Sequence, residues 1–159
     1  MKFTVYIETS VVGAYYDDRT DPVSAAQRLW TRQWWAHASE RYRLVTGRPV
    51  LDELRHPTYP HSIRACALIA SVPVIPIEPG VADIVQTYIR AKLMPRNPVG
   101  DALHVALASY HKCDFLLTWN CAHIANPTKF RRLQVVNTSL GLYVPLLATP
   151  NQMLEKSNE

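Results

Sequence analysis

Two short apolar segments constrain the fold of this chain more than any other feature. Residues 3–7 (FTVYI) are apolar on both alternating faces, and residues 114–118 (DFLLT) show the same kind of pattern. A strand that is apolar on both faces needs cover on both sides, as inside a parallel sheet. Neither segment approaches the roughly 20 apolar residues that a membrane-spanning helix requires. The sequence therefore predicts at least two buried strands and no membrane span.

Helical patterns separate these strands from shorter candidate strands. The predicted helices cover residues 22–40, 49–56, 60–70, 81–89, 98–109 and 130–136, and the further strands cover residues 43–46, 72–77 and 144–148. Pro73 and Pro76 place the strand at 72–77 near an edge, because proline cannot donate a ladder hydrogen bond. This alternation predicts an α/β fold, a three-layer doubly wound sheet of about five mostly parallel strands with helices on both faces.

The chain length favours a single domain. With 159 residues, 48% of them hydrophobic, it is long enough for one core and short for two. We predict one domain over residues 1–150 and a tail over residues 151–159, with a short helix after Thr149-Pro150. The N-terminus carries no apolar signal core, so a cytoplasmic protein is expected. Cys66, Cys113 and Cys121 form no paired spacing and are expected to be reduced.

The charge balance permits a nucleic-acid partner without requiring one. The formal charge is +4 and the pI is near 9.1. Lys and Arg side chains that neutralise phosphates gain affinity by releasing counterions. Lys129, Arg131 and Arg132 are candidates for such contacts, while a solvated basic face is the simpler interpretation.

Three acidic residues are candidates for a shared site. Glu8 directly follows the first buried strand, Glu53 lies in the helix after Pro49, and Asp101 lies in the first turn of a later helix. Each has an ordinary structural explanation when taken alone. Glu8 can cap a helix that begins near Val11, and Asp101 is favoured at the positive end of a helix dipole. About 45 and 48 residues separate the acids, so the three can lie close together only through the tertiary fold.

The predicted topology brings these acids to one edge of the sheet. Active groups gather beyond the carboxyl ends of parallel strands, and Thr118 and Asn120 follow such an end as Glu8 does. Two carboxylates about 4 Å apart repel by a few kcal/mol unless a cation lies between them. Mg²⁺ binds hard oxygen ligands, so the sequence predicts Mg²⁺ held by Glu8, Glu53 and Asp101.

Four segments, in this order, resemble the successive motifs of PIN-domain nucleases. They are residues 5–10 (VYIETS), 50–54 (VLDEL), 101–106 (DALHVA) and 116–120 (LLTWN). The resemblance covers nearly the whole chain. It implies a small doubly wound parallel sheet and hydrolysis of RNA with Mg²⁺ or Mn²⁺. Many members are VapC-type toxins of type II toxin–antitoxin pairs, so the resemblance also implies an antitoxin protein as partner and a homodimer.

The resemblance assigns a position to each acid of this chain. Glu8 takes the first acidic position, which is usually Asp, while Glu53 takes the second and Asp101 the third. Asn120 takes the place of a frequent fourth Asp. Glu8 is one methylene longer than Asp and Asn120 carries no charge, so a site with one metal ion is expected in place of two. The expected catalytic residues are these four.

The resulting hypothesis is a metal-dependent endoribonuclease. The acids would hold an ion that orients water for in-line attack on a phosphodiester. Thr9, Ser10 and Thr118 would contact the substrate or metal-bound water. His104 follows Asp101 by three residues on the same helical face, so it would hold an acid or a substrate phosphate, or simply pack beside the site.

Two other functions are compatible with the same fold. The first is a PIN-like module that binds RNA or an antitoxin with weakened or lost catalysis, as the changes at Glu8 and Asn120 suggest. The second is a doubly wound signalling or small-molecule domain. The second is disfavoured because no Gly-rich phosphate loop follows the first strand, and no acid pair with a lysine indicates a phosphoreceiver.

Overall fold

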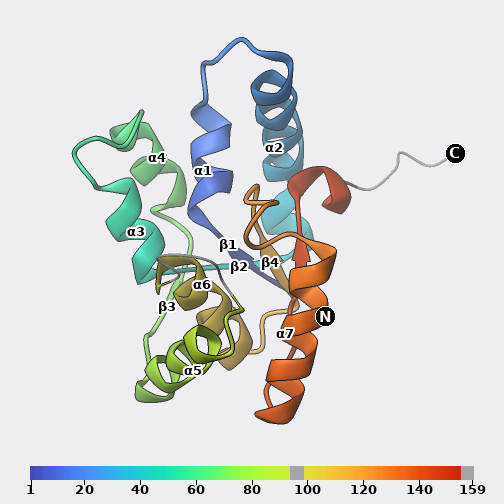
Figure 1. Ribbon diagram of the computed structural model, residues 1–159. Helices are drawn as coiled ribbons and strands as arrows, with labels where there is room; N and C mark the ends of the chain where they lie inside the picture. The colour runs from blue at the N-terminus through green and yellow to red at the C-terminus, as the bar shows by residue number, and fades with distance from the viewer. Residues whose placement is uncertain (94–98, 155–159) are drawn as a thin grey trace, which may run out of the picture.

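The computed structural model describes residues 1–93 and 99–154 (Figure 1). Its strands are β1 (Thr4–Ile7), β2 (Arg43–Gly47), β3 (Val74–Ile75), β4 (Phe115–Leu117) and β5 (Leu146–Ala148). Its helices are α1 (Thr9–Tyr16), α2 (Pro22–Arg41), α3 (Arg48–Leu54), α4 (Ser62–Ile69), α5 (Pro79–Arg90), α6 (Val99–Tyr110), α7 (Pro127–Ser139) and the 3-10 helix η1 (Pro150–Met153). Asn97-Pro98, the predicted start of α6, lies outside the described residues.

The strands form one sheet in the order β3-β2-β1-β4-β5, and every neighbouring pair is parallel. This confirms the predicted α/β fold, with a sheet that is parallel throughout. In the register, Tyr6 of β1 pairs with Val45 of β2 and with Leu116 of β4. The strand β3 lies at an edge, as Pro73 and Pro76 predict.

Helices cover both faces of the sheet. In Figure 1, α1 and α2 lie above the strands, while α5 and α6 lie below them. Val5, Tyr6 and Ile7 of β1 are fully buried, and so are Leu116 and Leu117 of β4. Cover on both faces explains why these two segments are apolar at every position and not only at alternate ones.

Capping residues set the starts of helices at opposite ends of the chain. The Asp21 carboxylate accepts a hydrogen bond from the backbone N–H of Ser24, and Pro22 occupies the first turn of α2. Thr149 and Gln152 form a reciprocal capping box at η1. No helix within the described residues is both long enough and apolar enough to cross a membrane. The three cysteines are free, as expected from their spacing.

The strand order creates a topological switch beside β1. The chain extends the sheet through β2 and β3 on one side of β1, and through β4 and β5 on the other. In doubly wound sheets, a crevice forms at such a point, beyond the carboxyl ends of the two strands. Glu8 follows β1 and Thr118 follows β4, so both residues lie at the switch.

Candidate metal centre

Glu8 joins β1 to α1 and is only 5% exposed. Its Oε2 atom accepts hydrogen bonds from the backbone N–H of Ser10 at 3.0 Å, from the Ser10 hydroxyl, and from the Thr118 hydroxyl at 2.7 Å. Glu8 is therefore the N-cap of α1, which was the structural explanation that the sequence offered. The cap uses a single oxygen, and no described residue donates a hydrogen bond to Oε1.

The segment that follows β4 is fastened to the start of α1. The Ser10 hydroxyl accepts a hydrogen bond from the backbone N–H of Trp119 at 2.8 Å, and the Thr118 hydroxyl accepts one from Asn120 at 3.0 Å. Thr118 is fully buried. Ser10 and Thr118, predicted as substrate contacts, thus hold the Glu8 carboxylate in place.

Glu53 approaches the same place from α3. The Thr9 hydroxyl donates a hydrogen bond to its Oε2 atom, and Nε2 of His104 lies 3.2 Å from its Oε1 atom. The Glu53 side chain is 41% exposed, so its outer side is open to solvent. Thr9, also predicted as a substrate contact, is buried and supports Glu53.

His104 connects the candidate site to the core of the protein. The side chain is 1% exposed, and its Nδ1 atom lies 2.8 Å from the Tyr6 hydroxyl. Burial, reinforced by the charges of Glu8 and Glu53, raises the pKa of Tyr6 well above its usual value, so this hydroxyl keeps its proton. In a neutral His104, Tyr6 donates to Nδ1 and the Nε2 proton faces Glu53, whereas in a protonated His104 the Nδ1 proton is donated to the Tyr6 oxygen.

Glu53 and His104 favour each other's charged form. Burial acts to raise the pKa of Glu53, but the hydrogen bond and charge of His104 and the bond from Thr9 hold that pKa below its usual value. Burial acts to lower the pKa of His104, yet the bond to Glu53 and the charges of Glu8, Glu53 and Asp101 bring it above its usual value. The pair therefore behaves as a partly buried ion pair beside further acids.

Glu8, Glu53 and His104 each place a ligand atom within 4.8 Å of the other two. This buried group of two acids and one histidine could hold a metal ion. The sequence predicted Asp101 as the third ligand, and Asp101 does not belong to this tight group. His104 completes the tight group because it lies one helical turn further along α6, where its ring faces Glu53.

Asp101 adjoins the tight group from the first turn of α6. The side-chain nitrogen of Asn120 lies 3.5 Å from each of its carboxylate oxygens. The Asn120 oxygen, predicted as a possible ligand for water or metal, instead accepts the backbone N–H of His123 at 3.0 Å. Asn120 therefore presents a donor to Asp101, which explains how a neutral residue can occupy this position.

The Asp101 carboxyl group has a raised pKa. Burial is the largest cause, and the negative charge of Glu53 acts in the same direction. The charges of His104 and His123 and the bond from Asn120 oppose the rise without cancelling it. A half-buried carboxylate without a full positive partner among the described residues costs stability, as is common for functional acids.

This cost predicts that Asp101→Asn makes the metal-free protein more stable. We expect a gain of roughly 1 kcal/mol at pH 7 to 8, or about 2–4 °C in Tm for a chain of this size. A raised folded-state pKa means that the charged form destabilises the fold, so the gain should disappear as the pH falls through that pKa. Thermal unfolding in EDTA, from pH 8 down into the acid range, measures both the gain and its loss. Asp83→Asn, at an exposed position of α5, is the control, and a lower Tm for Asp101→Asn would contradict the prediction.

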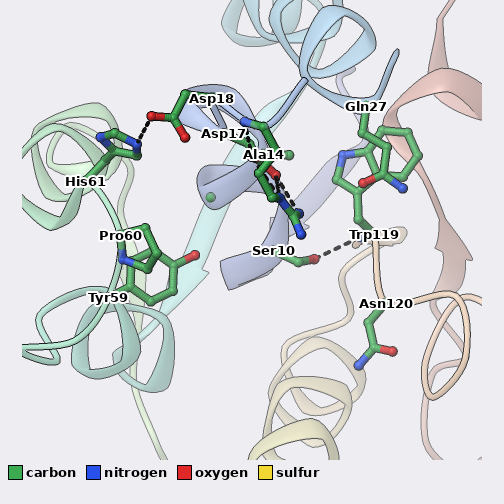
Figure 2. Close-up of a pocket in the computed structure, with 12 residues that line it drawn as sticks. Ser10, Ala14, Asp17, Asp18, Gln27, Tyr59, Pro60, His61, Trp119 and Asn120 are labelled. Atoms are coloured by element: carbon green, nitrogen blue, oxygen red, sulfur yellow. Dashed lines mark hydrogen bonds and ion pairs between the residues drawn. The ribbon is translucent and has the colours of Figure 1, made fainter. Parts of the chain in front are cut away.

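A cavity of about 570 Å³ opens beside the acids (Figure 2). Ser10 and Asn120, which contact Glu8 and Asp101 respectively, belong to its lining. Tyr59 and Trp119 form part of its walls. The volume lies within the range of about 300–1,000 Å³ that is typical of sites for small ligands.

The sequence pointed to Thr9, Ser10, Thr118 and His104 near the acids, but not to Tyr6 or Tyr59. Tyr6 reads only as a core residue of a strand, and Tyr59 lies in the irregular connection between α3 and α4. Gly13 and Gly47 were the available signals, because each is a position where another side chain closely approaches the backbone. Comparison of the chain with protein-family models, curated proteins and solved structures returns no match.

Proposed function

We propose that this chain is a divalent-metal-dependent ribonuclease of the PIN-like type. The single observation that carries the proposal is the meeting of Glu8, Glu53 and His104 at the topological switch, with Asp101 beside them. Glu8 at the β1–α1 junction, Glu53 of α3 and Asp101 of α6 come from three separate parts of the chain. The resemblance of four sequence segments to PIN-domain motifs supports the same function.

The donor set fits a divalent cation. Glu8 and Glu53 each offer a carboxylate oxygen, and His104 offers a ring nitrogen. Carboxylate oxygens suit Mg²⁺ and Mn²⁺, while an imidazole ligand favours Mn²⁺ over Mg²⁺. If Nε2 served as a ligand, the Nδ1 proton would be donated to the Tyr6 oxygen, which is the arrangement usual for metal-bound histidines. We therefore propose Glu8 and Glu53 as ligands, with His104 as a third.

A bound ion would supply positive charge to a phosphodiester and to an attacking water. The protein residues have separate tasks. Ser10, Thr118 and Thr9 hold the two acids as carboxylates. Asp101 has the raised pKa of a general base, so its carboxylate can accept a proton from the water as the new P–O bond forms. The bond from phosphorus to the leaving ribose oxygen breaks in the same displacement, and that oxygen takes a proton from solvent. Asn120 keeps that carboxylate turned toward the site.

RNA cleavage in the presence and absence of metal tests the proposal directly. We expect the protein to cut a mixture of structured RNAs with Mn²⁺ or Mg²⁺, and to lose this activity in excess EDTA because the acids then repel the phosphate. Adding Mn²⁺ back should restore cleavage. Cleavage that persists in EDTA, or no cleavage with either metal, would contradict the proposal.

A second candidate function is a PIN-like module that binds RNA or an antitoxin without cutting. The observation in its favour is that Asn120 uses its oxygen for His123 and supplies no charge. Titration calorimetry separates the two functions. Binding of RNA by a protein that shows no Mn²⁺ affinity would favour the module, whereas Mn²⁺ binding that is lost in Glu8→Gln would favour the nuclease.

Roles as the toxin of a type II pair and as a homodimer are proposed from the sequence resemblance alone. They predict that the protein arrests growth when expressed and that its neighbour gene relieves the arrest. Growth curves with and without the neighbour gene, together with light scattering of the purified chain, check both expectations.

A further inference from the structure

A groove runs along one face of α1, starting at the candidate metal centre. Its floor consists of Ser10, Gly13 and Ala14, which recur at helical spacing and have small side chains or none. Tyr59 and Trp119 stand on opposite sides of this helix (Figure 2). A helix of 8 residues rises about 12 Å. The groove is therefore long enough for a planar ring system beside the acids.

Tyr59 is held close above the floor. A Cβ atom at position 13 would collide with the Tyr59 hydroxyl, so only glycine allows this approach. Figure 2 shows the hydroxyl turned toward α1. No described residue forms a hydrogen bond with it. Burial, together with the charges of Glu8 and Glu53, raises the pKa of Tyr59 to about 12, so the hydroxyl remains a donor.

Trp119 forms a rigid opposite wall. Its indole N–H donates to the Thr31 hydroxyl at 2.8 Å, and its ring stacks on Trp30 with centroids 6.2 Å apart and planes at 26°. Its backbone N–H is tied to Ser10. A wall that is already ordered loses little entropy when a flat ligand packs against it.

Gln27 adds a free polar group to the groove. Its side-chain amide has no hydrogen-bond partner among the described residues, although the residue is partly buried and lines the cavity. An amide offers one donor and one acceptor side by side. This pairing matches the edge of a nucleobase, which likewise presents donors and acceptors next to each other.

The far end of the groove is closed by two bridges. The Arg19 guanidinium lies 2.6 Å from the Asp17 carboxylate, and the His61 ring lies 3.3 Å from that of Asp18. Arg28 donates to the backbone oxygen of Asp17 at 2.5 Å, so Arg19 and Arg28 are both already bound to protein oxygens. The carboxylates of Asp17 and Asp18 offer acceptor oxygens at this end, which suit a ring that donates hydrogen bonds better than a phosphate group.

We propose that this groove binds the nucleobase of the nucleotide next to the cleaved phosphate, and that it prefers bases with an exocyclic amino group. The inference rests on the proposed ribonuclease function, since the groove begins at the acids through Ser10 and Asn120. Tyr59 and Trp119 provide aromatic surface for the ring, and the Tyr59 hydroxyl donates to a ring nitrogen of the base. Gln27 and Asp18 provide acceptors for the amino group. A backbone phosphate stays outside, at the metal centre.

Nucleoside binding tests the proposal without any need for catalysis. In EDTA, adenosine and cytidine at millimolar concentration should shift the NMR signals of the Trp119 indole N–H and the Gln27 side-chain amide. Uridine should bind about fivefold more weakly, which is the worth of one hydrogen bond. Ribose 5-phosphate should leave both signals unchanged. Equal shifts with ribose 5-phosphate, or none with any nucleoside, would overturn the proposal.

Matched variants separate the groove from general effects on the fold. Gln27→Ala and Tyr59→Phe should each weaken adenosine binding by about fivefold. Gln33→Ala, at an exposed position of the same helix as Gln27, should leave binding unchanged. Adenosine binding that is equal in Gln27→Ala, Tyr59→Phe and the unmodified protein would place the nucleoside elsewhere and overturn the proposal.

The same proposal predicts a cleavage pattern. On a randomised RNA, the protein should prefer a base with an amino group at one position beside the cut, and Gln27→Ala should lose this preference. Absence of cleavage combined with nucleoside binding in the groove would refute the ribonuclease and leave the base site standing. Cleavage without any base preference would refute the base site and leave the ribonuclease standing.

Discussion

Glu53→Gln should lower the rate of metal-dependent RNA cleavage by about 100-fold or more, the usual loss when a charged group of a catalytic site is neutralised. The Glu53 oxygens accept from Thr9 on one side and face His104 on the other. The Gln side chain has only one acceptor oxygen, so its NH₂ group faces either Thr9 or His104, which are both donors to Glu53. The variant therefore loses the negative charge and the fixed orientation of the side chain. Single-turnover cleavage of labelled RNA with Mn²⁺ measures the change.

Asp52→Asn is a close control for this experiment. Asp52 precedes Glu53 on the same helix, but it is 59% exposed and its carboxylate pairs with Arg48 at 3.1 Å. An exposed pair of this kind contributes little, so the cleavage rate should stay within about twofold of that of the unmodified protein. Equal losses in both variants would show that the helix, and not the Glu53 carboxylate, matters. An unchanged rate in Glu53→Gln would remove Glu53 from the site.

Gly47→Ala should lower the free energy of unfolding by about 1–3 kcal/mol, the usual cost of overpacking. A Cβ atom at this position would lie 2.5 Å from the Tyr6 hydroxyl and 2.8 Å from Cδ1 of Leu107. Both neighbours are fully buried, so neither can move aside freely. Urea unfolding measures the loss. Gly80→Ala is the control, because its Cβ atom would meet only the exposed ring of Tyr110, at 3.1 Å.

The Tyr6 hydroxyl offers a way to check the cause of this loss. Tyr6→Phe alone should cost about 1 kcal/mol, since it leaves Nδ1 of His104 without its partner. In the double variant with Gly47→Ala, the closest clash is absent. The double variant should therefore lose about 0.5–1 kcal/mol less unfolding free energy than the sum of the losses in the two single variants. Strict additivity would show that the clash with Leu107 dominates.

The fold could be predicted from the sequence because its main signals are local. Residues 5–7 of β1 and 115–117 of β4 are apolar at successive positions, and neighbouring residues alone reveal that pattern. The helix caps at Asp21 and Thr149 are also local signals, because each depends only on the next three residues. Parallel order then follows from the alternation of strands and helices, since each crossover needs a helix.

The site could be predicted only in outline. Strand order brings Glu8 and Glu53 to one edge, but Asp101 and His104 lie one turn apart on the same helix. The choice between them depends on a contact between Tyr6 and His104, which are 98 positions apart in the chain. The spacing of residues in the sequence cannot predict a contact over such a separation. The groove depends similarly on Tyr59, in an irregular segment whose path follows from tertiary packing.

The acids of the candidate centre are held mainly by hydroxyl groups. Ser10 and Thr118 donate to Glu8, and Thr9 donates to Glu53. Within residues 1–93 and 99–154, no lysine or arginine pairs with Glu8, Glu53 or Asp101. An arginine paired with these acids would have to move before an ion could bind. Among the described residues, no lysine or arginine side chain occupies the candidate metal centre in this way. Ion uptake should therefore require only the loss of the His104 proton that faces Glu53, and it should weaken as the pH falls.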